Sequence, residues 1–354
     1  KGFRIQTMKI AIIHDWLTGM RGGEKCLEVL CKLYPSADIF TLLHIPGKVS
    51  SVIESHSIHT SFIQNLPFAE SKYRYYLPLM PFAIETFDLK EYDLILSSSH
   101  CVAKSVKPSP NSLHICYCHT PMRYIWDQFD QYFGRENSNG LITNAMKLVR
   151  PWLQRWDVRT SRRVNHFIAN SRHVQKRIKK YYNQEATIIP PPVDTGMFTP
   201  DKNEEKEDYF LIVSAFAPYK RLDLAVDAFN QLNLPFFVIG EGQDAKRLKE
   251  MAKPNIHFEG WLDNSQIRSH FARCRAFIFC GEEDFGITLL EAQAMGRPVI
   301  AFGRGGALET VVPDSQSWKP ETGIDKSATS QPTGVFFYEQ TPEALIKAIQ
   351  HFES

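Results

Sequence analysis

The chain repeatedly places a short, uninterrupted apolar run in front of a loop and a helix-like stretch. The first run is residues 9–14, and a glycine-containing loop and a helical pattern over residues 24–34 follow it. Because this run does not alternate apolar with polar side chains, the strand it predicts must be covered on both faces. Buried strands separated by helices are typical of a parallel sheet, so the alternation predicts an α/β fold.

The alternation starts twice along the chain. Proline-rich residues 190–192 and the charged stretch 201–208 interrupt it, and the apolar run 209–213 restarts it. Two sheets in one chain predict two domains, and 354 residues are enough for each to bury a core of its own. The other predicted strands are residues 93–97, 113–117, 166–169, 236–239, 256–258, 276–280 and 298–302.

We therefore predict two Rossmann-like domains joined by a linker. The first covers residues 8–195, the linker covers 196–208, and the second covers 209–354. Ligands of such sheets bind at the carboxyl ends of the strands. A cleft between the two domains is the expected site.

Composition is that of a water-soluble globular protein, with 43% hydrophobic and 23% charged residues. No apolar run approaches the roughly eighteen residues that span a membrane. The residues before Met8, the expected natural start, hold no signal-peptide core. The seven cysteines lack metal-site spacing, which predicts buried thiols and a cytoplasmic location. The chain contains no DxD motif, which would indicate a divalent metal ion, and no lysine in a sequence context typical of pyridoxal phosphate. We therefore expect neither a metal nor a cofactor.

Positive charge is concentrated in one tract of the first domain. Residues 147–180 contain eleven Lys or Arg and a single acid, Asp157. Either these residues form a solvated helix face, or they bind an anionic membrane or lipid-phosphate surface. No nucleic-acid-binding motif accompanies the charge, so we expect no nucleic acid partner.

The most specific local pattern is a pair of glutamates in the second domain. Glu283 and Glu291 are separated by seven residues that include Asp-Phe-Gly-Ile-Thr at 284–288. The pair follows the predicted strand 276–280 and enters a helix-like run over 289–295. A strand, a turn and a helix N-terminus present unpaired N–H groups that favour phosphate. The carboxylates suit the hydroxyls that flank a phosphate in a nucleotide sugar.

This pattern resembles the EX7E element of family 4 glycosyltransferases, which are retaining enzymes of the GT-B fold. The resemblance covers nearly the whole chain from Met8 to about Leu345, and the matching motifs occur in family order. They are Gly-Gly-Glu at 22–24, His-Thr-Pro at 119–121, Ile-Pro-Pro-Pro-Val-Asp at 189–194, Pro-Tyr-Lys-Arg at 218–221 and Gly-Glu-Gly at 240–242. It implies that the first domain binds the acceptor and the second the nucleotide sugar.

The resemblance also assigns roles to individual residues. Lys220 and Arg221 correspond to the diphosphate clamp, although Ala215 stands where the family usually has another Arg. Glu283 corresponds to the residue that binds the transferred sugar, and Glu291 to the one that binds the ribose. Backbone N–H groups for the phosphate and sugar are implied at Phe285, Gly286, Ile287, Thr288 and Leu289.

Other site residues come from both domains. His119 matches the family's active-site histidine, which contacts the sugar near the reaction centre. Gly22 and Gly23 allow the backbone to approach the diphosphate closely. Gly240 lines the nucleotide site. For Trp261, contact with the base and core packing remain open.

Several alternatives remain. The sequence GxGxxA at 240–245 matches a dinucleotide-binding fingerprint, but it lies outside the first strand and lacks a well-placed ribose acid, so a dehydrogenase is disfavoured. The family motifs most resemble bacterial mannosyltransferases of polysaccharide assembly that use GDP-mannose. UDP-glucose or UDP-N-acetylglucosamine is the alternative donor, and a nucleotide-sugar 2-epimerase and a non-enzymatic sensor are alternative functions. The expected acceptor is a glycan or polyprenyl-linked glycan at the inner face of the plasma membrane.

Overall fold

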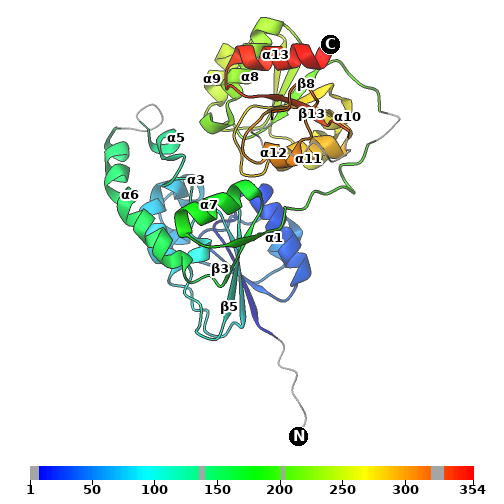
Figure 1. Ribbon diagram of the computed structural model, residues 1–354. Helices are drawn as coiled ribbons and strands as arrows, with labels where there is room; N and C mark the ends of the chain where they lie inside the picture. Colours follow the sequence, from blue (N-terminus) through cyan, green and yellow to red (C-terminus); the bar gives the residue numbers. More distant parts are fainter. Residues whose placement is uncertain (1–7, 135–139, 201–203, 320–330) are drawn as a thin grey trace. The chain divides into compact units, whose positions relative to one another are not determined.

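The computed structural model describes residues 8–134, 140–200, 204–319 and 331–354. The chain divides into two compact units, Lys1–Pro192 and Val193–Ser354. Each unit is a parallel sheet with helices on its faces (Figure 1).

The sheet of the first unit has seven strands in the order β3-β2-β1-β4-β5-β6-β7, and every neighbouring pair is parallel. The order reverses between β1 and β4, which is where ligands bind in sheets of this kind. The strands are β1 (Ile10–His14), β2 (Asp38–Thr41), β3 (Ile58–Thr60), β4 (Leu94–Ser99), β5 (Leu113–Cys118), β6 (His166–Ala169) and β7 (Ala186–Ile188).

Helices cover both faces of this sheet because its central strands are apolar on both sides. In β1, Ala11 and Ile13 pack into one core cluster, whereas Ile10 and Ile12 pack into another. The helices are α1 (Gly22–Leu33), α2 (Ser51–Glu54), α3 (Ala69–Lys72), α4 (Met80–Ile84), α5 (Phe129–Phe133), α6 (Gly140–Ser161) and α7 (Arg172–Tyr182), with 3₁₀ turns η1 (Phe62–Asn65), η2 (Tyr73–Leu79) and η3 (Ala103–Ser105).

The second unit repeats the design with six parallel strands in the order β10-β9-β8-β11-β12-β13. Here the order reverses between β8 and β11. Phe210 and Ile212 of β8 point into one core cluster and Leu211 into the other. The strands are β8 (Phe210–Val213), β9 (Phe236–Ile239), β10 (Ile256–Gly260), β11 (Ala276–Phe279), β12 (Val299–Phe302) and β13 (Gly334–Phe337).

Local capping fixes where several helices of this unit begin. The carboxylate of Asp263 accepts a hydrogen bond from the Gln266 N–H at 2.9 Å and starts one helix, and Thr341 caps another. The helices are η4 (Pro218–Lys220), α8 (Leu222–Leu232), α9 (Ala245–Met251), α10 (Asn264–Arg273), α11 (Ile287–Ala294), α12 (Ala307–Thr310) and α13 (Pro342–Glu353).

The predicted fold class is confirmed, and the errors are in details. The sequence analysis missed the short strands β2, β3, β7 and β13. Helix α11 begins at Ile287, two residues earlier than predicted, because Gly286 in the left-handed region turns the chain into it. Phe198, which the sequence analysis placed in the linker, is 2% exposed and packs in the core of the second unit.

The seven cysteines are all buried free thiols, as predicted. None of the helices in the described ranges is long and apolar enough to cross a membrane.

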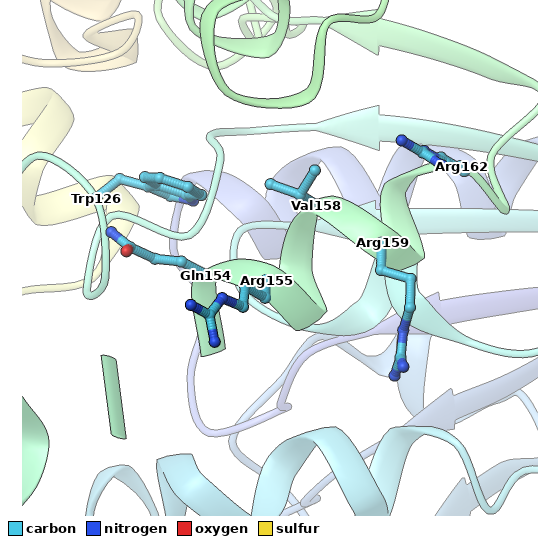
Figure 2. Close-up of a pocket in the computed structure, with 6 residues that line it drawn as sticks. All are labelled: Trp126, Gln154, Arg155, Val158, Arg159 and Arg162. Carbon is cyan, nitrogen blue, oxygen red and sulfur yellow. The ribbon is translucent and has the colours of Figure 1, made fainter. Parts of the chain in front are cut away.

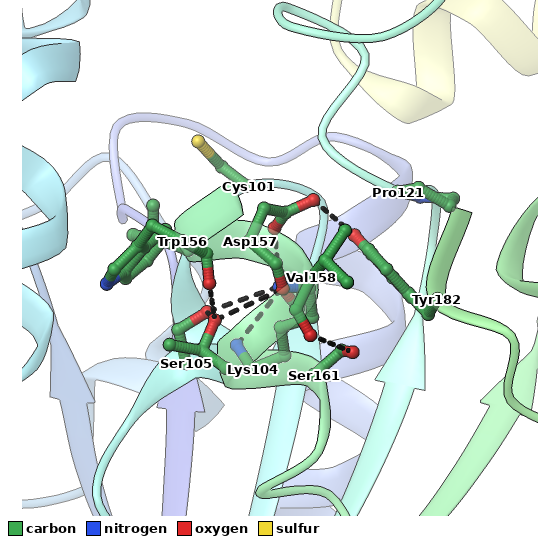
Figure 3. Close-up of polar contacts among 12 residues, drawn as sticks. Cys101, Lys104, Ser105, Pro121, Trp156, Asp157, Val158, Ser161 and Tyr182 are labelled. Atoms are coloured by element: carbon green, nitrogen blue, oxygen red, sulfur yellow. Dashed lines mark hydrogen bonds and ion pairs between the residues drawn. The ribbon is translucent and has the colours of Figure 1, made fainter. Parts of the chain in front are cut away.

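A buried ion pair connects α6 to the sheet of the first unit (Figure 3). The Lys104 ammonium on η3 lies 2.5 Å from the Asp157 carboxylate on α6, and the two side chains are 1% and 0% exposed. The other oxygen of Asp157 accepts hydrogen bonds from the Trp126 indole and the Tyr182 hydroxyl, each at 2.9 Å. Asp157 is therefore fully satisfied, as a buried charge must be.

Removing one partner of this pair should destabilise the first unit strongly. We expect Lys104→Met to lower the free energy of unfolding by about 3–5 kcal/mol, because it leaves an uncompensated buried carboxylate. Lys32→Met is the matched control. It breaks a surface pair with Glu28 and should cost less than about 0.5 kcal/mol. Urea unfolding of both variants measures the difference, and similar small losses would contradict a structural role for the buried pair.

Candidate functional site

Lys220 and Glu283 meet at the carboxyl edge of the second sheet. Lys220 ends η4 after β8, and Glu283 lies in the loop after β11, the neighbour of β8. Their side chains form an ion pair and are 19% and 12% exposed. The reversal of strand order therefore brings together two residues that the sequence analysis assigned to the diphosphate and the sugar.

Arg221 is also paired with a carboxylate. Its backbone has φ +55°, and it is the N-cap residue of α8. The guanidinium donates to Asp223 in the first turn, with N–O distances of 3.2 and 3.4 Å. A cation at a helix N-terminus is unfavourable by itself. Asp223 offsets that cost, so both predicted clamp residues have an acidic partner within the protein.

The loop that carries Glu283 is braced by a second glycine-rich turn. Gly305 forms an isolated parallel bridge with Glu283, and the Gly306 N–H donates to the Glu283 carbonyl at 2.8 Å. A Cβ at Gly305 would overlap that carbonyl, and one at Gly306 would overlap the backbone of Phe285. Only glycine permits this approach. The signal was present in the sequence, as Gly-Arg-Gly-Gly at 303–306 directly after a predicted strand.

Helix α11 follows this loop and supplies the predicted backbone donors. Gly286 has φ +83° and, as the N-cap residue, has no side chain with which to cap the helix. The N–H groups of Ile287 and Thr288 are in the first turn and have no acceptor on the side chain of the N-cap residue. The Leu289 side chain is buried in the core, so only its backbone can serve a ligand. Glu291 lies on the second turn and is 4% exposed.

Gly240 and Trp261 lie in the loops after β9 and β10. Gly240 has φ +135° and donates its N–H to the Gly260 carbonyl at 2.8 Å, and a Cβ there would overlap the Ser214 carbonyl. Gly240 therefore joins the loops after β8, β9 and β10. The Trp261 side chain is 70% exposed, which rules out core packing and leaves its ring accessible to a ligand.

The remaining predicted residues belong to the first unit. His119 follows β5, and its carbonyl accepts from the Asn170 amide at 3.0 Å. Gly22 and Gly23 open α1, and neither has a positive φ. A Cβ on Gly23 would lie 3.8 Å from the His119 ring, an ordinary contact. Glycine is thus not required by the backbone here; it keeps the space beside His119 open.

The structure adds a polar cluster around His119 that the sequence analysis missed. Its members are side chains at the carboxyl ends of β1 and β4 and on the first turn of α1, namely His14, Asp15, Glu24, Ser98 and His100. The Asp15 carboxylate accepts four backbone N–H groups from residues 100–103 at 2.6–2.9 Å. The sequence did contain a signal for this cluster. His14 and Asp15 stand at the end of β1, and Ser98 and His100 stand at the end of β4.

Ser98 couples the two imidazoles of His14 and His119. Its hydroxyl lies 2.8 Å from His119 Nε2 and 3.1 Å from His14 Nδ1, and it can donate to only one of them. The Glu24 carboxylate, 3.8 Å from His14 Nε2, favours a hydrogen on that nitrogen. For neutral imidazoles, Ser98 then donates to His14, and His119 Nε2 donates to Ser98. The Nδ1 of His119 is left as a hydrogen-bond acceptor suited to a sugar hydroxyl.

The surroundings keep His119 neutral. Burial, together with neighbouring His100 and His14, lowers the pKa of His119 to about 3. Burial alone would raise the pKa of Glu24, but its hydrogen bond with His14 lowers it. Among the described residues there is no group of three His, Cys, Asp or Glu side chains suited to a metal ion.

Two family models match the chain. One, described as Glycosyltransferase Family 4, matches residues 22–196, and the other, Glycosyl transferases group 1, matches residues 197–354. The two parallel-sheet units and this pair of matches define an enzyme of the GT-B glycosyltransferase class. The chain belongs to glycosyltransferase family 4.

Individual relatives are distant. An O-antigen chain mannosyltransferase C of Escherichia coli is 30% identical over 118 residues, covering 31% of this chain and 32% of its own length. A GDP-mannose-dependent α-(1-6)-phosphatidylinositol monomannoside mannosyltransferase of Mycolicibacterium smegmatis is 27% identical over 194 residues, covering 46% and 50%. The chain thus spans a half or less of the length of these relatives.

A solved structure shows the same fold over nearly the whole chain. Anabaena HepE, in complex with UDP and glucose, superposes with a TM-score of 0.65 at 16% identity, covering 98% of this chain and 90% of its own. At that identity the likeness concerns the fold alone.

The histidine environment predicts how stability depends on pH. The pKa of His119 is lowered to about 3 and that of His114, mainly by burial, to about 4. As pH falls, these two histidines become protonated in the unfolded chain at a higher pH than in the folded protein. The free energy of unfolding should therefore fall as pH drops from about 6.5 towards 4. Urea unfolding across this range measures the decline, and it should be shallower in His119→Gln. In nitrogen-15 spectra, titration of His119 above pH 5 would contradict this environment.

Proposed function

We propose that the protein is a retaining glycosyltransferase that moves mannose from GDP-mannose to a glycan or lipid-linked glycan. The Lys220–Glu283 pair carries this proposal, together with the N-terminus of α11, whose N-cap residue is Gly286. It joins a cation suited to a diphosphate with a carboxylate suited to a sugar hydroxyl. The braced loop holds Glu283 in place.

In this proposal, one set of residues stabilises the leaving group and another binds the sugar and the ribose. The sugar C1–O bond to the diphosphate breaks, a bond from C1 to the acceptor oxygen forms, and the acceptor proton leaves with the nucleoside diphosphate. Negative charge grows on the diphosphate as the bond breaks. Lys220, Arg221 and the N–H groups of α11 stabilise it. Glu283 orients the sugar, Glu291 binds the ribose, and His119 accepts a hydroxyl hydrogen through Nδ1.

Binding of the donor must reorganise the clamp. In the free protein Lys220 is paired with Glu283, and Arg221 with Asp223. A diphosphate that enters the site competes with both carboxylates for the cations. Glu283 is then released towards the sugar hydroxyls, so seating of the diphosphate and recognition of the sugar are coupled.

The mannose assignment rests on the relatives and on the Pro-Tyr-Lys-Arg motif at 218–221. The names of the relatives specify mannose transfer, and one of them specifies GDP-mannose. The alternative donor is a UDP sugar, as in the complex of Anabaena HepE. Neither donor requires a metal ion in this proposal.

We extend the proposal to location at an anionic membrane surface on the cytoplasmic side. Aromatic residues 73–82 support it in part. Tyr75 and Phe82 are 65% and 58% exposed, whereas Tyr73 and Leu77 are buried in the core. Part of this segment is therefore core, and the exposed part includes the aromatic rings of Tyr75 and Phe82.

Removal of either clamp cation should impair donor use. We expect Lys220→Ala and Arg221→Ala each to lower kcat/KM for the donor at least about tenfold, because each removes a charge-assisted contact worth about 1.5–3 kcal/mol. Thermal unfolding should stay close to wild type, since both side chains lie at the surface of the site. Lys246→Ala on α9, which also removes a paired surface lysine, is the control. Wild-type donor kinetics in both clamp variants would refute the assignment.

The two glutamates should separate sugar from nucleotide recognition. Glu283→Gln should reduce turnover while GDP binds as well as before or more tightly, because Lys220 loses its internal partner. Glu291→Gln should weaken GDP binding through the ribose. We choose Gln rather than Ala because Glu291 is only 4% exposed and a cavity would confuse the result. Calorimetry with GDP decides, and equal changes in affinity would show that the roles are misassigned.

A further inference from the structure

A pocket on the exposed face of α6 is lined by none of the residues assigned to the donor. It has a volume of about 380 Å³, within the usual range for ligand sites. Four lining side chains come from α6, one from the turn directly after it and one from the loop after β5 (Figure 2). They are Trp126, Gln154, Arg155, Val158, Arg159 and Arg162.

The aromatic wall of this pocket is held rigidly. The Trp126 indole N–H donates to Asp157, and the ring stacks on Tyr181 with centroids 4.5 Å apart. The backbone beside it is clamped as well, because Arg150 and Gln154 both donate to the Ile125 carbonyl at 2.8 Å. The indole position is therefore set before any ligand arrives, which reduces the entropy lost on binding.

The arginines of the pocket lack acidic partners. Arg155 and Arg159 lie one turn apart on one face of α6. Arg162 follows three residues later, just beyond the end of the helix, and lines the same pocket. All three are exposed, and none forms an ion pair with any residue that the structure describes. Asp157, the single acid of residues 147–180, is buried on the opposite face with Lys104. Positive charge on this face is thus uncompensated.

We infer that this pocket binds the diphosphate-linked saccharide of a lipid-borne acceptor. Guanidinium groups match phosphate oxygens in bidentate geometry. The Trp126 ring offers a flat apolar surface for a sugar, and the Gln154 side-chain oxygen offers an acceptor for a sugar hydroxyl. Naming the ligand as an acceptor rests on the proposed glycosyl transfer, but binding of a diphosphate here does not.

Exposed apolar side chains suited to a lipid lie on the same face of α6. Leu148 and Trp152 precede the arginines by one to two turns and are 83% and 40% exposed. Trp152 stacks on Phe82 of α4, with centroids 5.7 Å apart, and Phe82 is 58% exposed. An apolar strip therefore continues directly from the cationic pocket, as an amphipathic ligand requires.

The pocket is also connected to His119. Trp126 lies in the loop that begins at His119, seven residues further along the chain. Within this loop, Arg177 of α7 donates to the Thr120 hydroxyl and pairs with Asp127. A saccharide that stacks on Trp126 therefore contacts the same braced loop that positions the histidine.

Calorimetry with inorganic pyrophosphate tests the site. The full chain carrying Lys220→Ala and Arg221→Ala removes the proposed donor clamp, so the remaining binding reports on α6. Adding Arg155→Ala, Arg159→Ala and Arg162→Ala should weaken that binding at least tenfold. Lys147→Ala, Lys176→Ala and Lys180→Ala remove the same charge from the same basic tract outside the pocket, and should change it less than threefold. Equal losses in the two triple variants would overturn the inference.

A second probe separates a discrete site from a membrane surface. Geranyl diphosphate should bind the wild-type chain more tightly than pyrophosphate, and Leu148→Ser with Trp152→Ser should remove the difference. Binding to phosphatidylglycerol vesicles without binding to either soluble diphosphate would overturn the inference in favour of a bilayer surface. If the clamp changes leave GDP and pyrophosphate binding untouched, the donor assignment fails, while the comparison of the α6 variants still decides the pocket.

Discussion

A parallel strand that is buried on both faces can present polar groups only at its ends, and this constraint organises both units. The central strands of each sheet send alternate apolar side chains into two core clusters, as Ile10 to Ile13 do in β1. Nearly all the chemistry then collects at the carboxyl ends. His14, Ser98 and His119 come together there in the first unit, and Lys220 and Glu283 in the second.

Charge is compensated inside the protein at most of these positions. Lys104 is paired with Asp157 in the core, Arg221 with Asp223, and Lys220 with Glu283. The first pair fixes α6 and Trp126 in place. The pair at Lys220 instead lies at the site, where a diphosphate can exchange with the carboxylate. The arginine face of α6 is different, since its three arginines form no ion pair with any residue in the described ranges and are exposed to an external anion.

Some glycines are important here because they lack a side chain, and not only because their backbone is free to adopt unusual conformations. Gly305 and Gly306 let one loop lie directly on the backbone of another, which fixes Glu283. Gly23 has an ordinary helical backbone and serves by leaving room beside His119. The two kinds of glycine look alike in the sequence. They differ only in what a Cβ would meet.

The sequence by itself determined the fold class, the repetition of the α/β pattern and the family, because apolar periodicity and motif order are local properties. It also predicted Lys220, Glu283 and His119 at strand ends. The three-residue strands β3 and β7 could not be predicted, because so short a run carries too little periodicity, and the four-residue strands β2 and β13 were missed as well. Only the tertiary structure decided that Lys220 pairs with Glu283, that Ser98 joins His14 to His119, and that Trp126 meets the arginines of α6. Those contacts depend on strand order and helix docking, which bring together side chains from distant parts of the chain.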